Sequence, residues 1–315
     1  NTAHRKQNIF RSAPTHTRNM DGFQKALMSS FPGSMGEREF ISMIALNLSL
    51  KGFTKGNCIP IVGCCRDEIC ITLMDEVKAN FGDYFSIRGL GGFIFSGTSG
   101  FSAAHHHSPL VSGKSKYVYI VAPHIGISKD GIMGKCSREG RDAASSACGA
   151  LCGFYDNFKA GKVTAQLSMD DLEMSAMSQI LIESIPWGSK LDLAELTKIA
   201  AKAIAGKQLQ KVIAATVDVA KADYAVVAGI QIHGPGLKNS FFCPLPEFCY
   251  SVVDGKKEAV EIQNPFKKLL EFLSLKINEI YTFFEERSCF DGESLRLPAA
   301  VIAPKFEVFH SHSSV

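Results

Sequence analysis

Three short apolar runs, at residues 58–63, 84–88 and 116–122, constrain the fold of this chain most. Each run has the length of a buried strand and is bounded by turn residues. Helical patterns and two further strand patterns occupy much of the remaining sequence. Helices are predicted at 20–50 (with a break at 31–33), 68–81, 168–222 (with a break at 186–188) and 265–287, and strands at 223–232 and 241–253. The alternation predicts an α/β fold with a mainly parallel β-sheet flanked by helices, and additional helices beyond that.

Each of the three apolar runs ends at residues that can take part in chemistry. Cys65 and Asp67 follow the first run, Arg88 ends the second, and His124 comes directly after the third. Sites in parallel sheets form beyond the carboxyl ends of the strands. We therefore expect these four side chains to meet at one edge of the sheet.

Cysteine and histidine are the ligands that zinc prefers, and a catalytic zinc site has three protein ligands and one open position. Cys65, His124 and Cys148 fit this description, with Cys148 on the helix that follows a long loop at residues 126–141. Cys136 lies in that loop and is the rival third ligand. On the residues alone the metal signal is weak, because free cysteines are commonly core residues. Cys64 is assigned to the core, since neighbours in extended backbone point in opposite directions.

The composition excludes several classes of protein. With 46% hydrophobic residues, 21% charged residues and a net charge of +3, the chain is typical of a globular protein and gives no reason to expect nucleic acid as a partner. No apolar stretch approaches the roughly 20 residues of a membrane span. The ten scattered cysteines indicate a reducing compartment. Residues 1–19 are basic and predict a flexible arm, or the remnant of a transit peptide, and residues 20–315 are expected to form a single domain.

Four segments, in this order, resemble motifs of the β-carbonic anhydrases: Cys65-Arg-Asp67, residues 82–91, Val121-Ala-Pro-His124 and Ala147-Cys148-Gly149. That similarity covers about residues 58–155. A closer resemblance, over most of residues 20–310, is to the limiting-CO2-inducible protein B/C family of algae and diatoms. It is carried by Gly63-Cys-Cys-Arg-Asp-Glu68, Gly97-Thr-Ser-Gly-Phe101 and the run His105–His107.

This resemblance implies a zinc enzyme that interconverts CO2 and bicarbonate in a CO2-concentrating mechanism, with hydroxide at the zinc as nucleophile. The zinc ligands it implies are Cys65, His124 and Cys148, and Asp67 is the residue that orients the hydroxide. It also implies a homodimer, a hetero-oligomer with a paralogue, and a location in the chloroplast stroma near the pyrenoid. Neither nucleic acid nor a membrane is an expected partner.

Two departures from the β-carbonic anhydrase pattern stand out. A long insertion separates His124 from Cys148, and Ile69 occupies the position where an arginine usually follows the aspartate. We predict that Arg88 pairs with Asp67 instead, ahead of Arg66. An unpaired Asp67 would close the fourth zinc position, so the alternative function is a catalytically silent zinc protein that assembles with a paralogue.

Several other features have ordinary structural explanations. A polar loop is expected through Gly97–Gly100 and His105–His107, with the histidines solvated, and a tight turn is expected at Gly89–Gly92. Ser99, in Gly97–Gly100, suggests a hydrolase nucleophile but lacks the G-x-S-x-G elbow. His233 follows a predicted strand and is expected to be a hydrogen-bonded turn residue.

Overall fold

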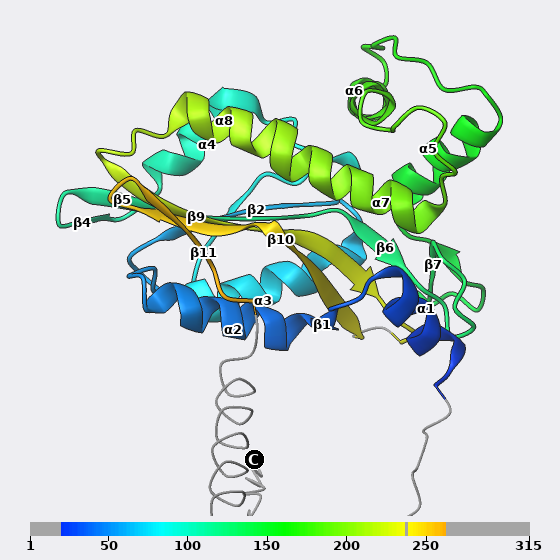
Figure 1. Ribbon diagram of the computed structural model, residues 1–315, viewed down its shortest axis with the longest axis horizontal. Coiled ribbons are helices and arrows are strands. Elements are labelled where there is room, and N and C mark those ends of the chain that lie inside the picture. The colour runs from blue at the N-terminus through cyan, green and yellow to red at the C-terminus, as the bar shows by residue number, and fades with distance from the viewer. Residues whose placement is uncertain (1–19, 237–238, 263–315) are drawn as a thin grey trace, which may run out of the picture. The chain divides into compact units, whose positions relative to one another are not determined.

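The computed structural model describes residues 20–236 and 239–262, which belong to one compact unit ending at Ile262 (Figure 1). The predicted arm at residues 1–19 and the predicted helix at 265–287 lie outside the described residues. The prediction of a single domain over residues 20–315 is therefore untested beyond Ile262. No helix among the described residues is long and apolar enough to cross a membrane.

A nine-stranded sheet forms the centre of the described unit. Its middle strands β9, β5, β2 and β3 are parallel, and β10 runs antiparallel to β9. The strands of this sheet are β1 (Met35–Gly36), β2 (Ile59–Cys64), β3 (Phe85–Ser86), β4 (Leu110–Val111), β5 (Lys114–Ala122), β6 (His124–Gly126), β9 (Ala222–His233), β10 (Ser240–Val253) and β11 (Lys256–Ala259). A separate two-stranded sheet pairs β7 (Lys135–Cys136) with β8 (Ser145–Ser146).

Helices cover both faces of the sheet, with α2 and α3 on one face and α4, α7 and α8 on the other (Figure 1). The helices are α1 (Gly22–Ser30), α2 (Glu37–Ser49), α3 (Ile71–Phe81), α4 (Gly97–His106), α5 (Gly149–Lys159), α6 (Leu172–Ile182), α7 (Leu193–Lys202) and α8 (Gln210–Thr216), with short helical turns η1 (Glu68–Cys70) and η2 (Leu90–Gly92) and a π-helix η3 (Ala203–Leu209). The predicted parallel sheet flanked by helices is confirmed, and so are the predicted breaks near residues 31–33 and 186–188.

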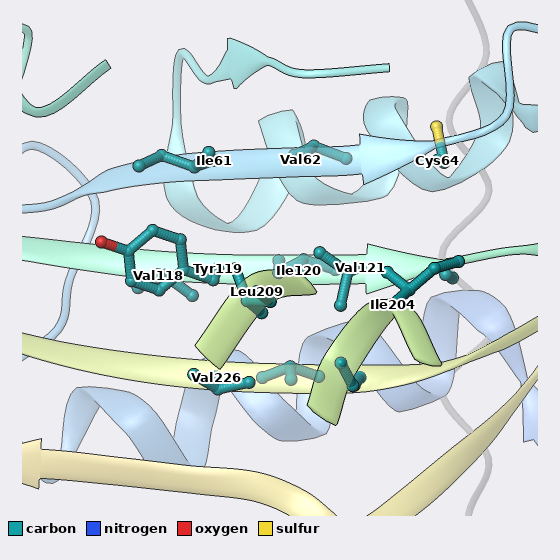
Figure 2. Packing of buried hydrophobic residues seen from close by; sticks show 14 of the residues in the cluster. Ile61, Val62, Cys64, Val118, Tyr119, Ile120, Val121, Ile204, Leu209 and Val226 are labelled. Carbon is teal, nitrogen blue, oxygen red and sulfur yellow. The ribbon is translucent and has the colours of Figure 1, made fainter. Parts of the chain in front are cut away.

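The main core cluster includes buried residues of α2 and α3 on one face of the sheet and of η3 on the other. Figure 2 shows Ile204 and Leu209 of η3 over the side chains of β5, with Ile61 and Val62 on the neighbouring β2. All six residues of β2 are buried. Strands that are covered on both faces read as continuous apolar runs, which is why the sequence pattern located them.

The structure corrects the prediction of a polar loop through residues 97–107. This segment is the helix α4, because Phe101 and Ala104 are one turn apart and both are buried. His106 and His107 are exposed as expected, whereas His105 is partly buried. Its Nε2 lies 2.6 Å from the hydroxyl oxygen of Tyr119, and burial lowers its pKa to about 4. Ser99 is exposed on the same helix.

Candidate metal centre

Cys65 is the first residue after β2, and its backbone is held on two sides. It forms an isolated parallel bridge with Gly89, and its carbonyl oxygen accepts a 2.8 Å hydrogen bond from Nε of Arg88. The side chain is buried. The end of the strand is therefore fixed, and the thiol of Cys65 is placed beyond the carboxyl edge of the sheet.

His124 begins β6, immediately after Pro123 and the end of β5. β6 runs parallel to β9 and pairs His124 with Gln231. The backbone at Pro123 is approached closely by Gly92, where φ is +82° and an added Cβ would lie 2.9 Å from the Cα of Pro123. A glycine is required at that position for both reasons. The tight turn predicted at residues 89–92 thus packs directly beside the histidine.

Cys148 is the N-cap residue of α5, so it lies at the start of the predicted helix rather than within it. The long insertion folds back on β6 through two hydrogen bonds, from the amide of Gly126 to the carbonyl oxygen of Ala147 (2.8 Å) and from the amide of Gly134 to that of Gly126 (2.8 Å). This contact brings Cys148 to His124 although 23 residues separate them in sequence.

The three predicted ligands come together. The Sγ atoms of Cys65 and Cys148 are 3.7 Å apart, and the ligand atoms of Cys65, His124 and Cys148 all lie within 4.8 Å of one another. All three side chains are buried. Among the described residues, Nε2 of His124 has no hydrogen-bond partner. A buried, unpaired ring nitrogen beside two thiols fits a metal ion, because burying a polar atom without a partner is otherwise unfavourable.

The electrostatics of the two thiols also suit a metal. The hydrogen bond from Cys148, together with His124, lowers the pKa of Cys65 to about 4 despite its burial. The same hydrogen bond and burial raise the pKa of Cys148 well above its ordinary value. Within this pair, ionisation of Cys65 is favoured over ionisation of Cys148, and a bound cation would favour ionisation of both thiols.

Cys136, the rival third ligand, lies in neither of the groups of three ligand atoms found among the described residues. Its Sγ is 3.8 Å from the hydroxyl oxygen of Ser145 across the β7–β8 pair. Burial raises the pKa of its thiol. The geometry therefore places Cys148, and not Cys136, beside Cys65 and His124.

Asp67 lies next to the three ligands and forms a two-point ion pair with Arg138. The guanidinium donates to both carboxylate oxygens at 2.8 Å, and the amide of Ile69 donates to Oδ1 at 3.4 Å. Oδ2 is 3.8 Å from Nε2 of His124. Burial would raise the pKa of Asp67, but the hydrogen bonds from Arg138 and the nearby His124 lower it to about 2. Asp67 is therefore ionised at neutral pH.

Arg88 was predicted to pair with the carboxylate of Asp67, but Arg138 makes that contact instead. Arg88 donates to backbone oxygens, from Nε to the carbonyl of Cys65 and from Nη2 to that of Asp67 (2.7 Å). Arg66 forms an ion pair with Glu173 at the surface. Arg138 comes from the insertion, which carried no motif in the sequence. Its spacing from Asp67 is 71 residues, so no local pattern could have indicated the pair.

His233, expected to be a turn residue, is buried beside the centre. Its Nε2 lies 3.1 Å from Nδ1 of His124 and 4.0 Å from Sγ of Cys70. Burial lowers the pKa of His233 well below its ordinary value. Cys70, His124 and His233 form a second group of three buried ligand atoms, which shares His124 with the first.

An open pocket of about 900 Å³ lies beside Arg138, which is one of its lining residues. Its walls include Glu68, Ile69, Thr72 and Arg138, and Arg138 joins the pocket to the carboxylate of Asp67. Arg138 also forms an ion pair with Glu68. The pocket thus opens beside the arginine that holds Asp67.

The sequence matches the family of limiting CO2-inducible proteins B/C beta carbonic anhydrases over residues 34–251, more than half of the chain. The chain belongs to this family. The matched region contains Cys65, His124 and Cys148, and the fold is like that of carbonic anhydrases. A search of curated proteins gives no match.

Solved structures agree with this assignment. The crystal structure of limiting CO2-inducible protein LCIB is 32% identical, with a TM-score of 0.61, and the match covers 75% of this chain and 98% of that one. The crystal structure of PtLCIB4, a homologue of LCIB, is 24% identical with a TM-score of 0.63, and covers 76% of this chain and 98% of that one. The second match shows the shared fold alone.

Proposed function

We propose that this member of the family is a zinc-dependent carbonic anhydrase that interconverts CO2 and bicarbonate. The observation that carries the proposal is the bidentate ion pair between Arg138 and Asp67. This pair lies beside the thiols of Cys65 and Cys148 and beside Nε2 of His124, which has no hydrogen-bond partner among the described residues. Both carboxylate oxygens are occupied by the guanidinium, which favours a carboxylate that stays off the metal. A site of this kind keeps a fourth position open.

Cys65, His124 and Cys148 are the residues that would hold zinc. Zinc bound there would supply a Lewis acid that lowers the pKa of water to about 7, so that hydroxide is available at neutral pH. Two thiolates and a neutral imidazole balance the charge of a divalent cation. The donor set therefore fits zinc, which favours sulfur and nitrogen ligands.

Asp67 would act on the nucleophile. Because Arg138 keeps its carboxylate ionised and fixed, Asp67 can accept a hydrogen bond from the attacking oxygen and orient a lone pair of that oxygen towards CO2. Arg88 serves a different purpose, since its two hydrogen bonds hold the backbone of Cys65 and Asp67. The side chains that carry the reaction are thus positioned before substrate arrives.

Partners and location are proposed on the family resemblance. The proposal comprises a homodimer, a hetero-oligomer with a paralogue, and residence in the chloroplast stroma near the pyrenoid as part of a CO2-concentrating mechanism. Size-exclusion chromatography with light scattering tests the dimer, and a fluorescent fusion in an algal cell tests the location.

The activity is tested by stopped-flow CO2 hydration on reduced protein loaded with zinc, with chelator-treated protein as the control. We expect a rate above that of buffer which depends on zinc. The D67N variant should hold zinc and lose most of this rate. No rate above buffer at full zinc occupancy would contradict the enzyme and favour the alternative, a catalytically silent zinc protein that assembles with a paralogue.

A further inference from the structure

The two ring nitrogens of His124 have different surroundings. Nε2 is close to the thiols and to Asp67 and has no hydrogen-bond partner among the described residues, whereas Nδ1 lies 3.1 Å from Nε2 of His233. The two rings meet edge to face, with centroids 5.2 Å apart and planes at 77°. Both are buried, His124 with 0% and His233 with 6% exposed. The ring of His233 therefore contacts the ring of His124 directly.

The hydrogen bond between the two rings has a direction that metal binding dictates. For Nε2 of His124 to offer a lone pair to a metal, the proton of the neutral imidazole must be on Nδ1. Nδ1 then donates to Nε2 of His233, which must accept. A neutral His233 consequently carries its own proton on Nδ1, and that atom lies 3.4 Å from the hydroxyl oxygen of Ser240.

The fold fixes this row of side chains. His233 ends β9, and the antiparallel pairing of β9 with β10 places Ser240 opposite it. The hydroxyl of Thr72, on α3, donates to the hydroxyl oxygen of Ser240 at 3.3 Å. Gln231 lies two residues before His233 on the same face of β9, and its Nε2 donates to the hydroxyl oxygen of Thr72 at 3.0 Å. Two strands and one helix thus hold the acceptor of His124 in place.

We infer that His233 is a positioning residue of the metal centre: by accepting from Nδ1 of His124 it fixes the tautomer and ring orientation that present Nε2 to the metal. The inference rests on the proposed metal centre. Hydrogen-bond partners of this kind typically change metal affinity or activity by about 10- to 100-fold when they are removed.

The rival explanation is a metal ion held by Cys70, His124 and His233, whose ligand atoms also lie within 4.8 Å of one another. Such an ion would bind Nδ1 of His124 and would exclude the proton that the hydrogen bond requires. The two explanations therefore predict different protonation of the same atom, and only one of them leaves Nε2 of His233 as an acceptor.

The first test compares two variants by zinc competition with a chromophoric chelator. H233Q keeps an acceptor oxygen near the position of Nε2, and H233L removes it. We expect H233L to bind zinc about 10- to 100-fold more weakly than wild type and H233Q to bind within a few-fold of it. S240A, which removes the partner of Nδ1 of His233, should show a smaller loss than H233L. Zinc affinity of H233L equal to wild type would overturn the inference.

The second test uses the wild-type protein for NMR and the C70S variant for a metal count. Nitrogen-15 NMR of the zinc-loaded wild-type protein should show protons on Nδ1 of both His124 and His233, and none on Nε2 of His233. A proton on Nε2 of His233 would overturn the inference, and so would two metal ions per chain of which one is lost in C70S. A wild-type protein that binds no zinc would overturn the metal centre and the proposed function with it, which is a distinct outcome from unchanged affinity in H233L.

Discussion

Arg138 and Asp67 form a two-point ion pair, with both carboxylate oxygens 2.8 Å from the guanidinium nitrogens. The pair joins the end of the first central strand to an insertion 71 residues later. Arg138 therefore pairs with the aspartate in place of the arginine that the β-carbonic anhydrase pattern would have at Ile69. The state of the candidate centre, open or closed by its own carboxylate, therefore depends on a contact between distant segments.

Removal of Arg138 should abolish most of the CO2 hydration activity while the protein still binds zinc. We expect R138L to lower the CO2 hydration rate by about 100-fold, because Asp67 is released and becomes free to approach the metal. The pKa of Asp67, now about 2, should rise, so the acid limit of any residual activity moves to higher pH. The matched control is R141L, an exposed arginine of the same pocket. Equal rates in the two variants would contradict this role.

The choice of third ligand is tested by zinc stoichiometry in two cysteine variants. C148S should lose zinc affinity by more than the roughly 100-fold that loss of a ligand's hydrogen-bond partner costs, because a direct ligand is gone. C136S removes a buried thiol that contacts Ser145 and should keep its zinc. Retained zinc in C148S together with loss in C136S would exchange their roles.

Arg88 should matter for folding more than its surface neighbour Arg66 does. R88M leaves the carbonyl oxygens of Cys65 and Asp67 without their charged donor, and we expect a loss of roughly 1–3 kcal/mol in the free energy of unfolding. R66M breaks a solvent-exposed ion pair with Glu173 and should cost less than about 1 kcal/mol. Urea unfolding of both metal-free variants gives the comparison, and equal losses would speak against the anchoring role of Arg88.

Glu37 predicts a pH dependence of stability that does not arise from any of the proposed metal ligands. Burial raises its pKa from 4.5 to about 7 in the folded protein. The folded state therefore holds the extra proton, so this contribution to stability is present below pH 4.5 and is lost as the pH rises through about 7. The shift corresponds to roughly 3 kcal/mol at pH 8.

The E37Q variant keeps an acceptor for Gln231, which donates to Oε2 of Glu37 at 2.7 Å, and cannot ionise. We expect its free energy of unfolding to exceed that of wild type at pH 8 and to approach it near pH 4.5. E39Q, an exposed change in the first turn of the same helix, serves as the control. A constant difference between E37Q and wild type across this range would show that Glu37 titrates normally.

The sequence predicts the strands of this fold well, because β2 and β5 are covered on both faces and read as continuous apolar runs. It also places Cys65, Asp67 and His124 correctly at strand ends. The sequence does not predict the helix α4, because its glycines, serines and histidines are typical of a loop and only Phe101 and Ala104 are buried. Two apolar residues at helical spacing are too few to indicate a helix in a segment of that composition.

The supporting residues of the centre could not be predicted from local patterns. Arg138 reaches Asp67 only because the insertion folds back on β6, and His233 meets His124 only because β6 pairs with β9. Both contacts are long-range consequences of strand pairing. A strand-end histidine such as His233 was the one available signal, and an ordinary turn residue has the same sequence appearance.

The most direct test of the proposed open zinc centre is a crystal structure of the reduced, zinc-loaded protein. The account predicts zinc on Cys65, His124 Nε2 and Cys148, a fourth position free of protein atoms, and Asp67 still paired with Arg138. A structure in which Asp67 itself coordinates the zinc would contradict the open site, and zinc bound without Cys148 would contradict the ligand set.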